Sequence, residues 1–443
     1  MSPKNLFFVL ILCFTLFSEA QHSVSGSLSP ADDYKWLIAY KLNPDHQNYI
    51  VDTAVKNGAF SLDIPANAQP GMYRLVYAVP QEEFYLDFIY NGKEDIVLSF
   101  DSQKGLSFKS STENLLYTRY FNEIHGLEKQ IAQFYSEQKK DRSLLLNLNK
   151  KLAAVQQSFE TQSKGLLSGH FISANRPYIP SGYEDVATYV KHKREHYFDA
   201  LDFNDNVLQG SDFLKDKVVN YIFTALPHHQ IASKEKELEI IENAKELAQL
   251  LEDVSATNKV ELFNSLWTQA SNDNLNKVAD FIYDNYLKSL ATRTNKSELI
   301  KKIEIQNRLR MGAVAPEITW NDGSNTKKLS DLSGAKNYVI VFWSSTCSHC
   351  LQQLPEFHKA LKDISSTKVL AIGLEDDDVT WKKESAKLPD FIHGIALGKW
   401  ESPYADIYDI HQTPTFYILD NEKRIIARPE DYKGVVKFLK EKK

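Results

Sequence analysis

The sequence predicts three folded parts: an antiparallel β-sandwich over residues 21–110, an all-helical region over 111–310 and an α/β domain over 311–443. Three observations support this division. Short runs rich in Val, Tyr and Phe, separated by turns that contain Gly, fill the first part. Apolar residues then recur at helical spacing in the second part. In the last part, apolar strands alternate with helical segments, which is typical of a layered α/β fold.

The charge and composition fit a protein with packed cores and no nucleic-acid partner. The 443 residues include 52 Lys and Arg against 58 Asp and Glu, which gives a formal net charge of −6. Hydrophobic residues make up 43% of the chain, so disorder is not expected. Nucleic-acid binding needs a basic stripe, and the charges do not form one.

Residues 1–20 have the pattern of a secretory signal peptide. Lys4 supplies the positive charge, residues 6–17 form the apolar stretch, and the small residues Ser18 and Ala20 suit cleavage near Ala20. A retained membrane anchor is the alternative, but the run is shorter than the roughly 20 apolar residues that span a bilayer. The pattern therefore predicts an exported protein.

Six short runs in the first part predict β-strands. They lie at Trp36 to Tyr40, Tyr49 to Val55, Gly58 to Ile64, Tyr73 to Tyr77, Phe84 to Tyr90 and Asp95 to Phe100. Strands at this spacing favour a small antiparallel sandwich. No cluster of catalytic residue types occurs among these runs, so we interpret this part as a structural or docking module.

The helical part contains one pattern that resembles a metal site. His192 and His196 frame an H-x-x-E-H sequence, and residues four apart share one helix face, so both rings could reach one zinc ion. No convincing third ligand follows on a second helix, so we favour a charged helix surface and expect no metal. The His228-His229 pair after Pro227 is interpreted in the same way, as a loop.

The C-S-H-C sequence from Cys347 to Cys350 marks the candidate active site. A buried strand over residues 338–343 precedes it, and apolar residues at helical spacing follow it, which places Cys347 at the first turn of a helix. Free backbone N–H groups and the positive end of the helix dipole stabilise a thiolate there. Once the leader with Cys13 is removed, this pair holds the remaining cysteines, so it indicates redox chemistry rather than stabilisation.

Further elements of an α/β fold surround this site. Strands are predicted at Val369 to Leu374, Phe391 to Leu397, Phe416 to Leu419 and Arg424 to Ala427, and helices at Thr380 to Leu388 and Tyr432 to Lys440. Asn321-Asp322-Gly323 predicts a hairpin turn. The alternation implies a central sheet with helices packed on it.

Four motifs carry a resemblance to a known family. They are G-x-x-A-P at Gly312 to Pro316, F-W-x-x-x-C-x-x-C at Phe342 to Cys350, Pro355 in the following helix and T-P-T-F at Thr413 to Phe416. In this order they resemble the thioredoxin fold, and most closely the extracytoplasmic thiol-disulfide oxidoreductases of the TlpA/ResA type. The whole layout also resembles large thioredoxin-like proteins of Bacteroidetes-type bacteria. The resemblance implies a protein of the periplasm or cell envelope of a Gram-negative bacterium.

The resemblance also implies roles for individual residues. Cys347 would attack a substrate disulfide, and Cys350, one helical turn on, would resolve the mixed disulfide. Pro414 would follow a cis bond and leave the Thr413 backbone open to pair with a substrate strand. Glu375 matches an acidic position behind the active site, where a half-buried carboxylate could accept the proton of the resolving thiol. A solvated acidic loop is the alternative for Glu375.

His349 departs from the family pattern, because many TlpA/ResA relatives have Pro before the second cysteine. A His at this position resembles the oxidising periplasmic protein DsbA, in which it helps to stabilise the thiolate. The fold resemblance thus favours a reductase and His349 favours an oxidant or isomerase, so the direction stays open. An exposed residue that only fills the turn is the further alternative.

The leading hypothesis is an exported protein-disulfide oxidoreductase that exchanges electrons with protein thiols and disulfides. It would need no metal, flavin or nicotinamide, and a membrane electron donor or acceptor would recharge it. Apocytochrome c, outer-membrane proteins and sugar-processing enzymes are all open as clients, and the oligomeric state is open too. One alternative is a redox-gated binding or assembly module. Another is a peroxiredoxin-type peroxidase, for which Ser344 is well placed but Ile340 stands where a Pro is needed.

Overall fold

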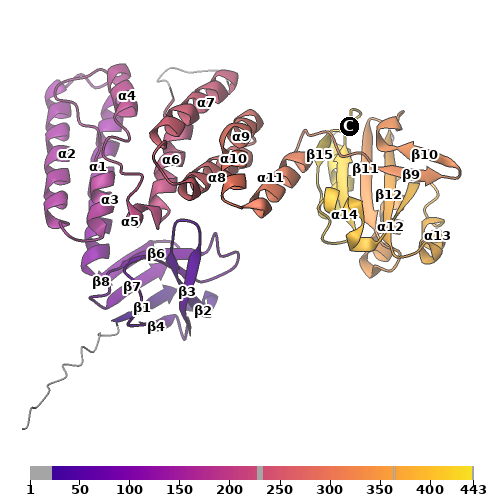
Figure 1. The fold of residues 1–443 in the computed structure, drawn as a ribbon, viewed down its shortest axis with the longest axis horizontal. Helices are drawn as coiled ribbons and strands as arrows, with labels where there is room; N and C mark the ends of the chain where they lie inside the picture. Colours follow the sequence, from indigo (N-terminus) through magenta and orange to yellow (C-terminus); the bar gives the residue numbers. More distant parts are fainter. Residues whose placement is uncertain (1–21, 227–232, 363, 365, 442–443) are drawn as a thin grey trace, which may run out of the picture. The chain divides into compact units, whose positions relative to one another are not determined.

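The computed structural model describes residues 22–226, 233–362, 364 and 366–441. It divides into two compact units, Met1–Thr294 and Asn295–Lys443 (Figure 1). The expected signal peptide and the His228-His229 pair lie outside the described residues. Each unit has its own hydrophobic cores, so each is a separate folded body.

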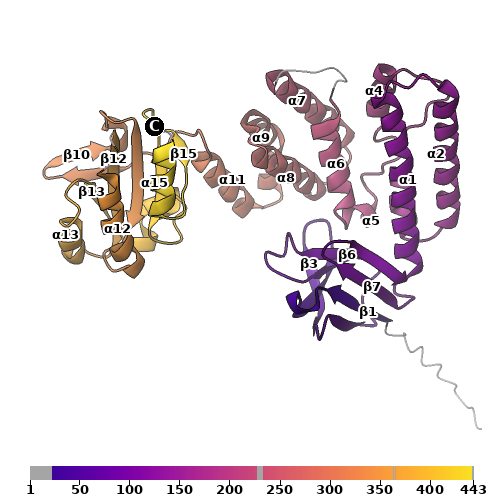
Figure 2. The same ribbon diagram turned by 180° about the vertical axis from the view of Figure 1, so that it is seen from behind.

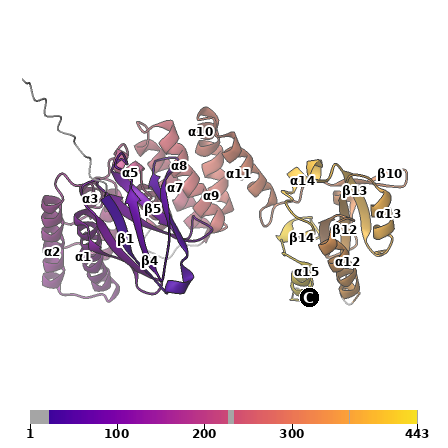
Figure 3. The ribbon, with the colours of Figure 1, turned by 90° about the horizontal axis from the view of Figure 1, so that it is seen from below.

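Two four-stranded sheets begin the first unit (Figure 3). Their orders are β4-β1-β7-β8 and β3-β2-β5-β6. The strands are β1 (His22–Ser29), β2 (Trp36–Leu42), β3 (Gln47–Ala54), β4 (Ala59–Ile64), β5 (Gly71–Val76), β6 (Tyr85–Tyr90), β7 (Ile96–Asp101) and β8 (Gly105–Ser110), with a 3-10 turn at Ala31–Asp33. One cluster of buried apolar side chains draws on both sheets, including Val24 and Leu62 from one and Leu37 and Phe88 from the other.

The expectation of a purely antiparallel module is wrong for one strand pair. β1 is antiparallel to β4 but parallel to β7. A tight hairpin forces neighbouring strands to run antiparallel, but β1 and β7 are far apart in the chain, so no turn sets their relative direction. The sequence prediction also missed β1 and β8. The sequence of β1, H-S-V-S-G-S-L-S, is rich in serine and has few apolar residues, so it lacks the usual strand signal. Val24 and Leu28 are nevertheless buried in the core.

Helices complete the first unit (Figure 2). They are α1 (Thr112–Ser136), α2 (Arg142–Gln162), α3 (Ser168–Ala174), α4 (Val186–Glu195), α5 (Asn206–Gln209), α6 (Phe213–Thr224), α7 (Ser233–Leu250), α8 (Ala256–Asn272), α9 (Asn276–Ile282) and α10 (Lys288–Arg293), with a π-helical turn at Tyr283–Leu287. The long helices α1 and α2 lie side by side, and the Tyr120 hydroxyl donates a 2.7 Å hydrogen bond to Gln156 Oε1 between them. Within the described residues, no helix is long and apolar enough to cross a bilayer.

Buried polar contacts join these helices to the sheets. The Asn114 amide at the start of α1 pairs with both backbone groups of Ile89 in β6, at 2.8 Å each. Arg74 in β5 forms an ion pair with Asp87 in β6 at 2.8 Å and another with Asp212, which precedes α6. The sheets and helices that the sequence assigned to two domains therefore form one unit.

The second unit is built on a five-stranded mixed sheet of order β13-β12-β11-β14-β15. Its strands are β11 (Asn337–Trp343), β12 (Thr367–Glu375), β13 (Ile392–Leu397), β14 (Thr415–Leu419) and β15 (Ile425–Ala427); its helices are α11 (Ser297–Leu309), α12 (Ser348–Leu361), α13 (Val379–Ser385), α14 (Pro403–Ile407) and α15 (Tyr432–Glu441). A hairpin of β9 (Thr319–Asp322) and β10 (Asn325–Lys328) turns at Gly323, as predicted.

The two faces of this sheet carry separate cores. α12 and α15 pack on one face, around Val339, Val341 and Phe357, and α11 and α14 pack on the other, around Ile340 and Phe342. β11 is parallel to β12 and antiparallel to β14, so the sheet is mixed. This architecture is the thioredoxin-like fold that the sequence predicts.

Helix α11 lies within the predicted helical region but packs in the second unit. Ile305 and Leu309 contact the core under the central sheet, and Arg308 Nε donates a 3.0 Å hydrogen bond to the Ile407 carbonyl. Lys301 and Asp406 add an ion pair at 3.1 Å. The helical period shows that α11 has an apolar face, but it does not tell which core that face meets. The structure therefore divides the chain at Thr294, and not at residue 310.

Candidate functional site

The C-x-x-C pair lies where β11 passes into α12. β11 ends at Trp343, and Cys347 is the N-cap residue of α12, with its backbone N–H bonded to the Ser344 carbonyl at 3.1 Å. The Cys347 sulfur accepts a hydrogen bond from the Cys350 N–H at 3.3 Å, as an N-cap side chain does. Cys347 is partly exposed and Cys350 is fully buried. The strand-to-helix turn predicted from the sequence therefore positions both thiols.

The loop before β14 brings Thr413 and Pro414 to the same place. β14 runs antiparallel to β11 with Thr415 opposite Phe342, so the residues just before Thr415 lie at the end of β11 that carries the cysteines. The Thr413–Pro414 bond is cis, as the resemblance implies. The Cys347 thiol donates to the Thr413 carbonyl at 3.3 Å. These two residues, 66 positions apart in the chain, thus form one surface.

The surroundings of Cys347 favour its thiolate. Burial alone would raise the pKa of Cys347, but hydrogen bonds outweigh it and hold that pKa below its ordinary value. They come from the Cys350 thiol, from the Thr413 side chain and from the backbone N–H groups of Cys350 and His349. Donors fixed around a sulfur stabilise its negative charge, which makes Cys347 the better nucleophile of the pair.

Cys350 has the opposite character. Burial, with the Cys347 sulfur beside it, raises the pKa of Cys350 to about 12. This thiol is protonated at neutral pH and has no exposed surface, so a bulky disulfide cannot reach it directly. It needs a base before it can attack.

Glu375 lies at the end of β12, behind the turn that carries the cysteines. The Ser345 N–H donates to Glu375 Oε1, and the Ser344 hydroxyl donates to Oε2 at 3.3 Å. Glu375 is only 3% exposed, so it is not part of a solvated acidic loop. That loop starts one residue later, at the exposed Asp376. Its role as a proton acceptor stays a prediction.

His349 lies on the exposed side of the turn. Its backbone N–H is one of the groups that lower the pKa of Cys347. In the described part of the chain, its side chain has no hydrogen bond, ion pair or ring contact. The contribution expected from its imidazole stays a prediction, whereas the backbone contribution follows from its place in the first turn of α12.

Three neighbours of the dithiol were not predicted. The Ser344 and Thr346 hydroxyls lie 3.0 Å apart, and Ser344 reaches Glu375. Trp381 of α13 packs against the core that contains Cys350, and it lies so close to Gly373 in β12 that a methyl group there would have no room. Two hydroxyl residues just before the first cysteine were visible in the sequence, but their link to Glu375 depends on how β11 and β12 pair.

The H-x-x-E-H residues of α4 are engaged by nearby side chains. His192 Nδ1 lies 2.7 Å from Glu184 Oε1, and His196 Nδ1 lies 2.7 Å from Asp199 Oδ2. The Tyr178 ring stacks on His196 at 5.2 Å between centroids. Across the residues with described positions, no group of three or more His, Cys, Asp or Glu side chains is arranged to hold a metal ion.

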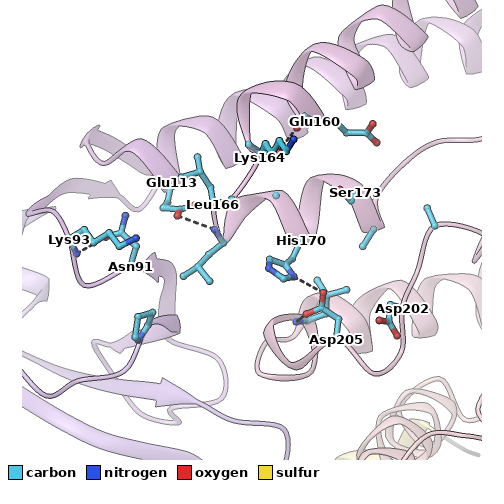
Figure 4. Close-up of a pocket in the computed structure, with 18 residues that line it drawn as sticks. Asn91, Lys93, Glu113, Glu160, Lys164, Leu166, His170, Ser173, Asp202 and Asp205 are labelled. Atoms are coloured by element: carbon cyan, nitrogen blue, oxygen red, sulfur yellow. Dashed lines mark hydrogen bonds and ion pairs between the residues drawn. The ribbon is translucent and has the colours of Figure 1, made fainter.

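A cavity of about 660 Å³ in the first unit lies between the β6–β7 loop and helices α1 to α3 (Figure 4). Several of its charged side chains make contacts within the protein. Glu113 accepts the N–H groups of Leu167 and Ser168 at 3.0 and 2.8 Å, which caps α3, and His170 Nδ1 lies 2.6 Å from Asp205 Oδ2. The Glu113 contacts hold the end of the α2–α3 loop in place, and the His170 contact joins α3 to the start of α5.

Comparison with known proteins matches the second unit. Residues 311–428 match the AhpC/TSA family. This match covers both cysteines, Glu375 and the cis proline. No curated protein matches the chain.

Several solved structures resemble parts of the chain. A domain of a possible thiol-disulfide isomerase from Cytophaga hutchinsonii is 29% identical, covers 30% of this chain and 93% of its own, and has a TM-score of 0.28. A thioredoxin-like protein from Bacteroides caccae is 18% identical over 60% of this chain and 98% of its own, with a TM-score of 0.34. A thiol-disulfide oxidoreductase from Bacteroides fragilis is 20% identical over 30% of this chain and 100% of its own, with a TM-score of 0.27.

Proposed function

We propose that this protein is an exported thiol-disulfide oxidoreductase of the TlpA/ResA type that acts on protein substrates through Cys347 and Cys350. The observation that carries the proposal is the asymmetry of the dithiol. Cys347 is partly exposed and its pKa is lowered, whereas Cys350 is buried and its pKa is raised to about 12. One sulfur is thus built to attack from solution, and the other is protected until the first has reacted.

The reaction proceeds by two exchanges in which electrons balance. The Cys347 thiolate attacks one sulfur of a substrate disulfide, forming a mixed disulfide and releasing the other substrate sulfur as a thiolate. Cys350 then loses its proton and attacks the Cys347 sulfur, which forms the Cys347–Cys350 disulfide and releases the second substrate thiol. The substrate is reduced by two electrons and the protein is oxidised by two. The reverse sequence oxidises a substrate dithiol.

The Thr413 carbonyl is suited to hold the substrate during these steps. It lies 3.3 Å from the Cys347 sulfur at the end of an exposed loop segment. A substrate backbone that pairs there would present its disulfide to Cys347 in line with the attack. The geometry suits an extended protein segment better than a small thiol.

The location and partners belong to the same proposal. The leader pattern supports export to the periplasm or cell envelope, where disulfides persist. A membrane electron donor or acceptor would restore the dithiol after each cycle, and the first unit would recruit clients. Thiols of apocytochrome c are one client class to test, beside outer-membrane proteins and sugar-processing enzymes.

Reduction of insulin disulfides, with a chemical reductant to recycle the protein, tests the activity. The unaltered protein should accelerate precipitation of the insulin chains, and Cys347→Ser should abolish the acceleration. Cys350→Ser should instead accumulate a mixed disulfide between Cys347 and insulin, visible by mass. Turnover that persists in Cys347→Ser would refute the proposal.

The activity of a protein that contains only the second unit would show what the first unit contributes to the reaction. A shortened protein should begin at Asn295 and not at Met311, because α11 contributes Ile305 and Leu309 to the core of the second unit. If the shortened protein reduces insulin as fast as the full chain does but reduces envelope clients more slowly, the first unit serves to recognise clients. If it is inert with a folded sheet, the binding or assembly module becomes the better description.

A peroxidase is the second candidate, because a partly exposed sulfur with a lowered pKa also suits attack on a peroxide. Ile340, at the position where such enzymes need a Pro, is buried within β11. Consumption of hydrogen peroxide by Cys350→Ser at a rate equal to its reaction with disulfides would favour this candidate. We expect the reaction with disulfides to dominate.

A further inference from the structure

The Glu375 carboxyl is enclosed, so a proton that it accepts needs a way out. Glu375 is 3% exposed, and β13 pairs with its backbone on one side, where Leu397 lies opposite. Its Oε1 accepts the Ser345 N–H, and a backbone amide of this kind cannot pass a proton on. In the described part of the chain, the Ser344 hydroxyl is the one hydroxyl that contacts the carboxylate.

Ser344 continues this contact toward solvent. Its hydroxyl donates to Glu375 Oε2 at 3.3 Å, and the same oxygen lies 3.0 Å from the Thr346 hydroxyl and 3.3 Å from the Thr346 N–H. A serine hydroxyl has one proton to give and two lone pairs to accept with, so these contacts use its full capacity. Ser344 is 7% exposed, whereas Thr346 is an exposed residue.

Ser344 also lies next to the thiol that must lose a proton. The Ser344 carbonyl accepts the Cys347 N–H at 3.1 Å, and the Ser344 backbone partly offsets the rise that burial causes in the pKa of Cys350. The segment from Ser344 to Thr346 thus lies between the dithiol, the buried carboxylate and solvent.

We propose that the Ser344 and Thr346 hydroxyls form a proton path between the Glu375 carboxyl and solvent, with Ser344 as the residue that positions the carboxylate. This inference rests on the proposed function and deepens it. It assigns a role to two residues for which the family resemblance implies none.

Each transfer along the path is balanced. When Cys350 is deprotonated for its attack, Glu375 holds the proton as a carboxylic acid. The acid then gives its proton to Ser344 Oγ while Ser344 gives its own to Thr346 Oγ1, and Thr346 gives its own to water. The Ser344 and Thr346 hydroxyls each gain one proton and lose one, Glu375 returns to a carboxylate, and one proton has left the protein.

Lys399 is a charged residue near Glu375 that could be considered as an alternative proton carrier. Lys399, which follows β13, feels the charge of Glu375 and of Asp377 and forms an ion pair with Asp376 at 2.6 Å. Its ammonium is engaged at the surface, so it balances the acidic loop and does not replace the hydroxyls as a proton carrier.

A single-turnover reaction isolates the step. The reduced full-length protein is mixed with an aromatic disulfide that releases one coloured thiolate when Cys347 attacks and a second when Cys350 resolves the adduct. The second phase is intramolecular, so substrate binding does not affect it. Its rate is measured from pH 4 to 9 for the unaltered protein, Ser344→Ala, Ser344→Thr, Thr346→Val and Glu375→Gln, a range that brackets the ordinary pKa of a carboxyl and that of a thiol.

A matched control is available in the same unit. Ser385 is also 7% exposed, and its hydroxyl donates to a backbone carbonyl, that of Lys382, at 3.3 Å. Ser385→Ala removes a hydroxyl of equal burial away from the dithiol, so it shows what a purely structural loss does to the second phase.

We expect Ser344→Ala to slow the second phase about tenfold at neutral pH and to make its rate rise with hydroxide concentration, since general acid–base assistance typically contributes one hundredfold or more. Ser344→Thr should restore the rate and the profile, and Ser385→Ala should leave both unchanged. Thr346→Val should slow the phase less, because water can replace an exposed hydroxyl.

The outcomes separate the two levels of the proposal. A second phase that is absent from the unaltered protein would contradict the proposed function itself. A normal second phase that Glu375→Gln slows but Ser344→Ala leaves unchanged would overturn the proton path alone. If neither substitution changes the pH profile, both the path and the role of Glu375 fail.

Discussion

Removing the Cys350 thiol should raise the pKa of Cys347. In the structure, the Cys350 thiol and the Cys350 N–H both donate to the Cys347 sulfur, and Cys350→Ala removes only the first. A hydrogen bond to a charged group contributes about 1.5–3 kcal/mol, and a thiol is a weak donor, so the lower figure applies. Since one pKa unit corresponds to about 1.36 kcal/mol, the pKa of Cys347 should rise by about one unit.

The assay is the rate of alkylation by iodoacetamide as a function of pH, because only the thiolate reacts. The midpoint for Cys350→Ala should lie about one unit above that of Cys350→Ser, whose hydroxyl keeps a donor next to the sulfur. Both variants have a single reactive cysteine, so the comparison is direct. Equal midpoints would refute the assignment of Cys350 as a donor and leave the backbone N–H groups of α12 as the cause of the lowered pKa.

Two further predictions concern the packing that supports the site and the first unit. Gly373→Ala should destabilise the second unit by about 1–3 kcal/mol, because the new methyl group would lie 2.5 Å from Trp381 Nε1 and the indole would have to move; urea unfolding and tryptophan fluorescence measure this. Arg74→Met should destabilise the first unit by about 3 kcal/mol, because it leaves Asp87 and Asp212 without their shared partner; it should not change the alkylation of Cys347.

Control variants exist for both predictions. Gly182→Ala adds a methyl group where no atom lies within 4 Å, so it should not move any side chain. Arg424→Met removes an exposed ion pair, with Glu422, so little stability should be lost. If Arg424→Met and Arg74→Met lower the free energy of unfolding equally, the ion pairs of Arg74 with Asp87 and Asp212 are not important for stability. An unchanged tryptophan spectrum in Gly373→Ala would contradict the close contact.

The sequence predicted the second unit well because its local signals agree with its tertiary structure. The run from Tyr338 to Trp343 is β-branched and aromatic, and it forms the fully buried β11. The apolar spacing after Cys350 matches the face of α12 that packs on the sheet. The cis bond before Pro414 could be predicted only from the resemblance, since nothing local in T-P-T-F requires it.

Other features depend on contacts that no local pattern contains. Serines in β1 masked its alternation, and the direction of β1 relative to β7 depends on the path of the chain between them. The helical period of α11 did not show that its apolar face meets the second unit. Ser344 and Glu375 are 31 positions apart, and only the parallel pairing of β11 with β12 brings them into contact.

The burial of Glu375 illustrates the same limit in a single residue. The sequence shows an acidic run that starts at Glu375, and composition alone favours a solvated loop. Because β12 continues to Glu375, the strand carries this one carboxylate under the turn before the run becomes exposed. If β12 ended one residue earlier, the Glu375 carboxylate would lie in solvent and not behind the dithiol.

The reduction potential of the Cys347–Cys350 pair in the full-length protein shows whether the two thiols exchange electrons as a pair. Equilibration against a series of redox buffers, with quantification of the free thiols, gives the value. We expect one reversible two-electron transition at a potential between about −270 mV, typical of thioredoxin, and about −120 mV, typical of DsbA. A value near the lower limit would indicate a reductase, and one near the upper limit an oxidant. If no disulfide forms between the two cysteines in any buffer, the proposed exchange reaction is contradicted.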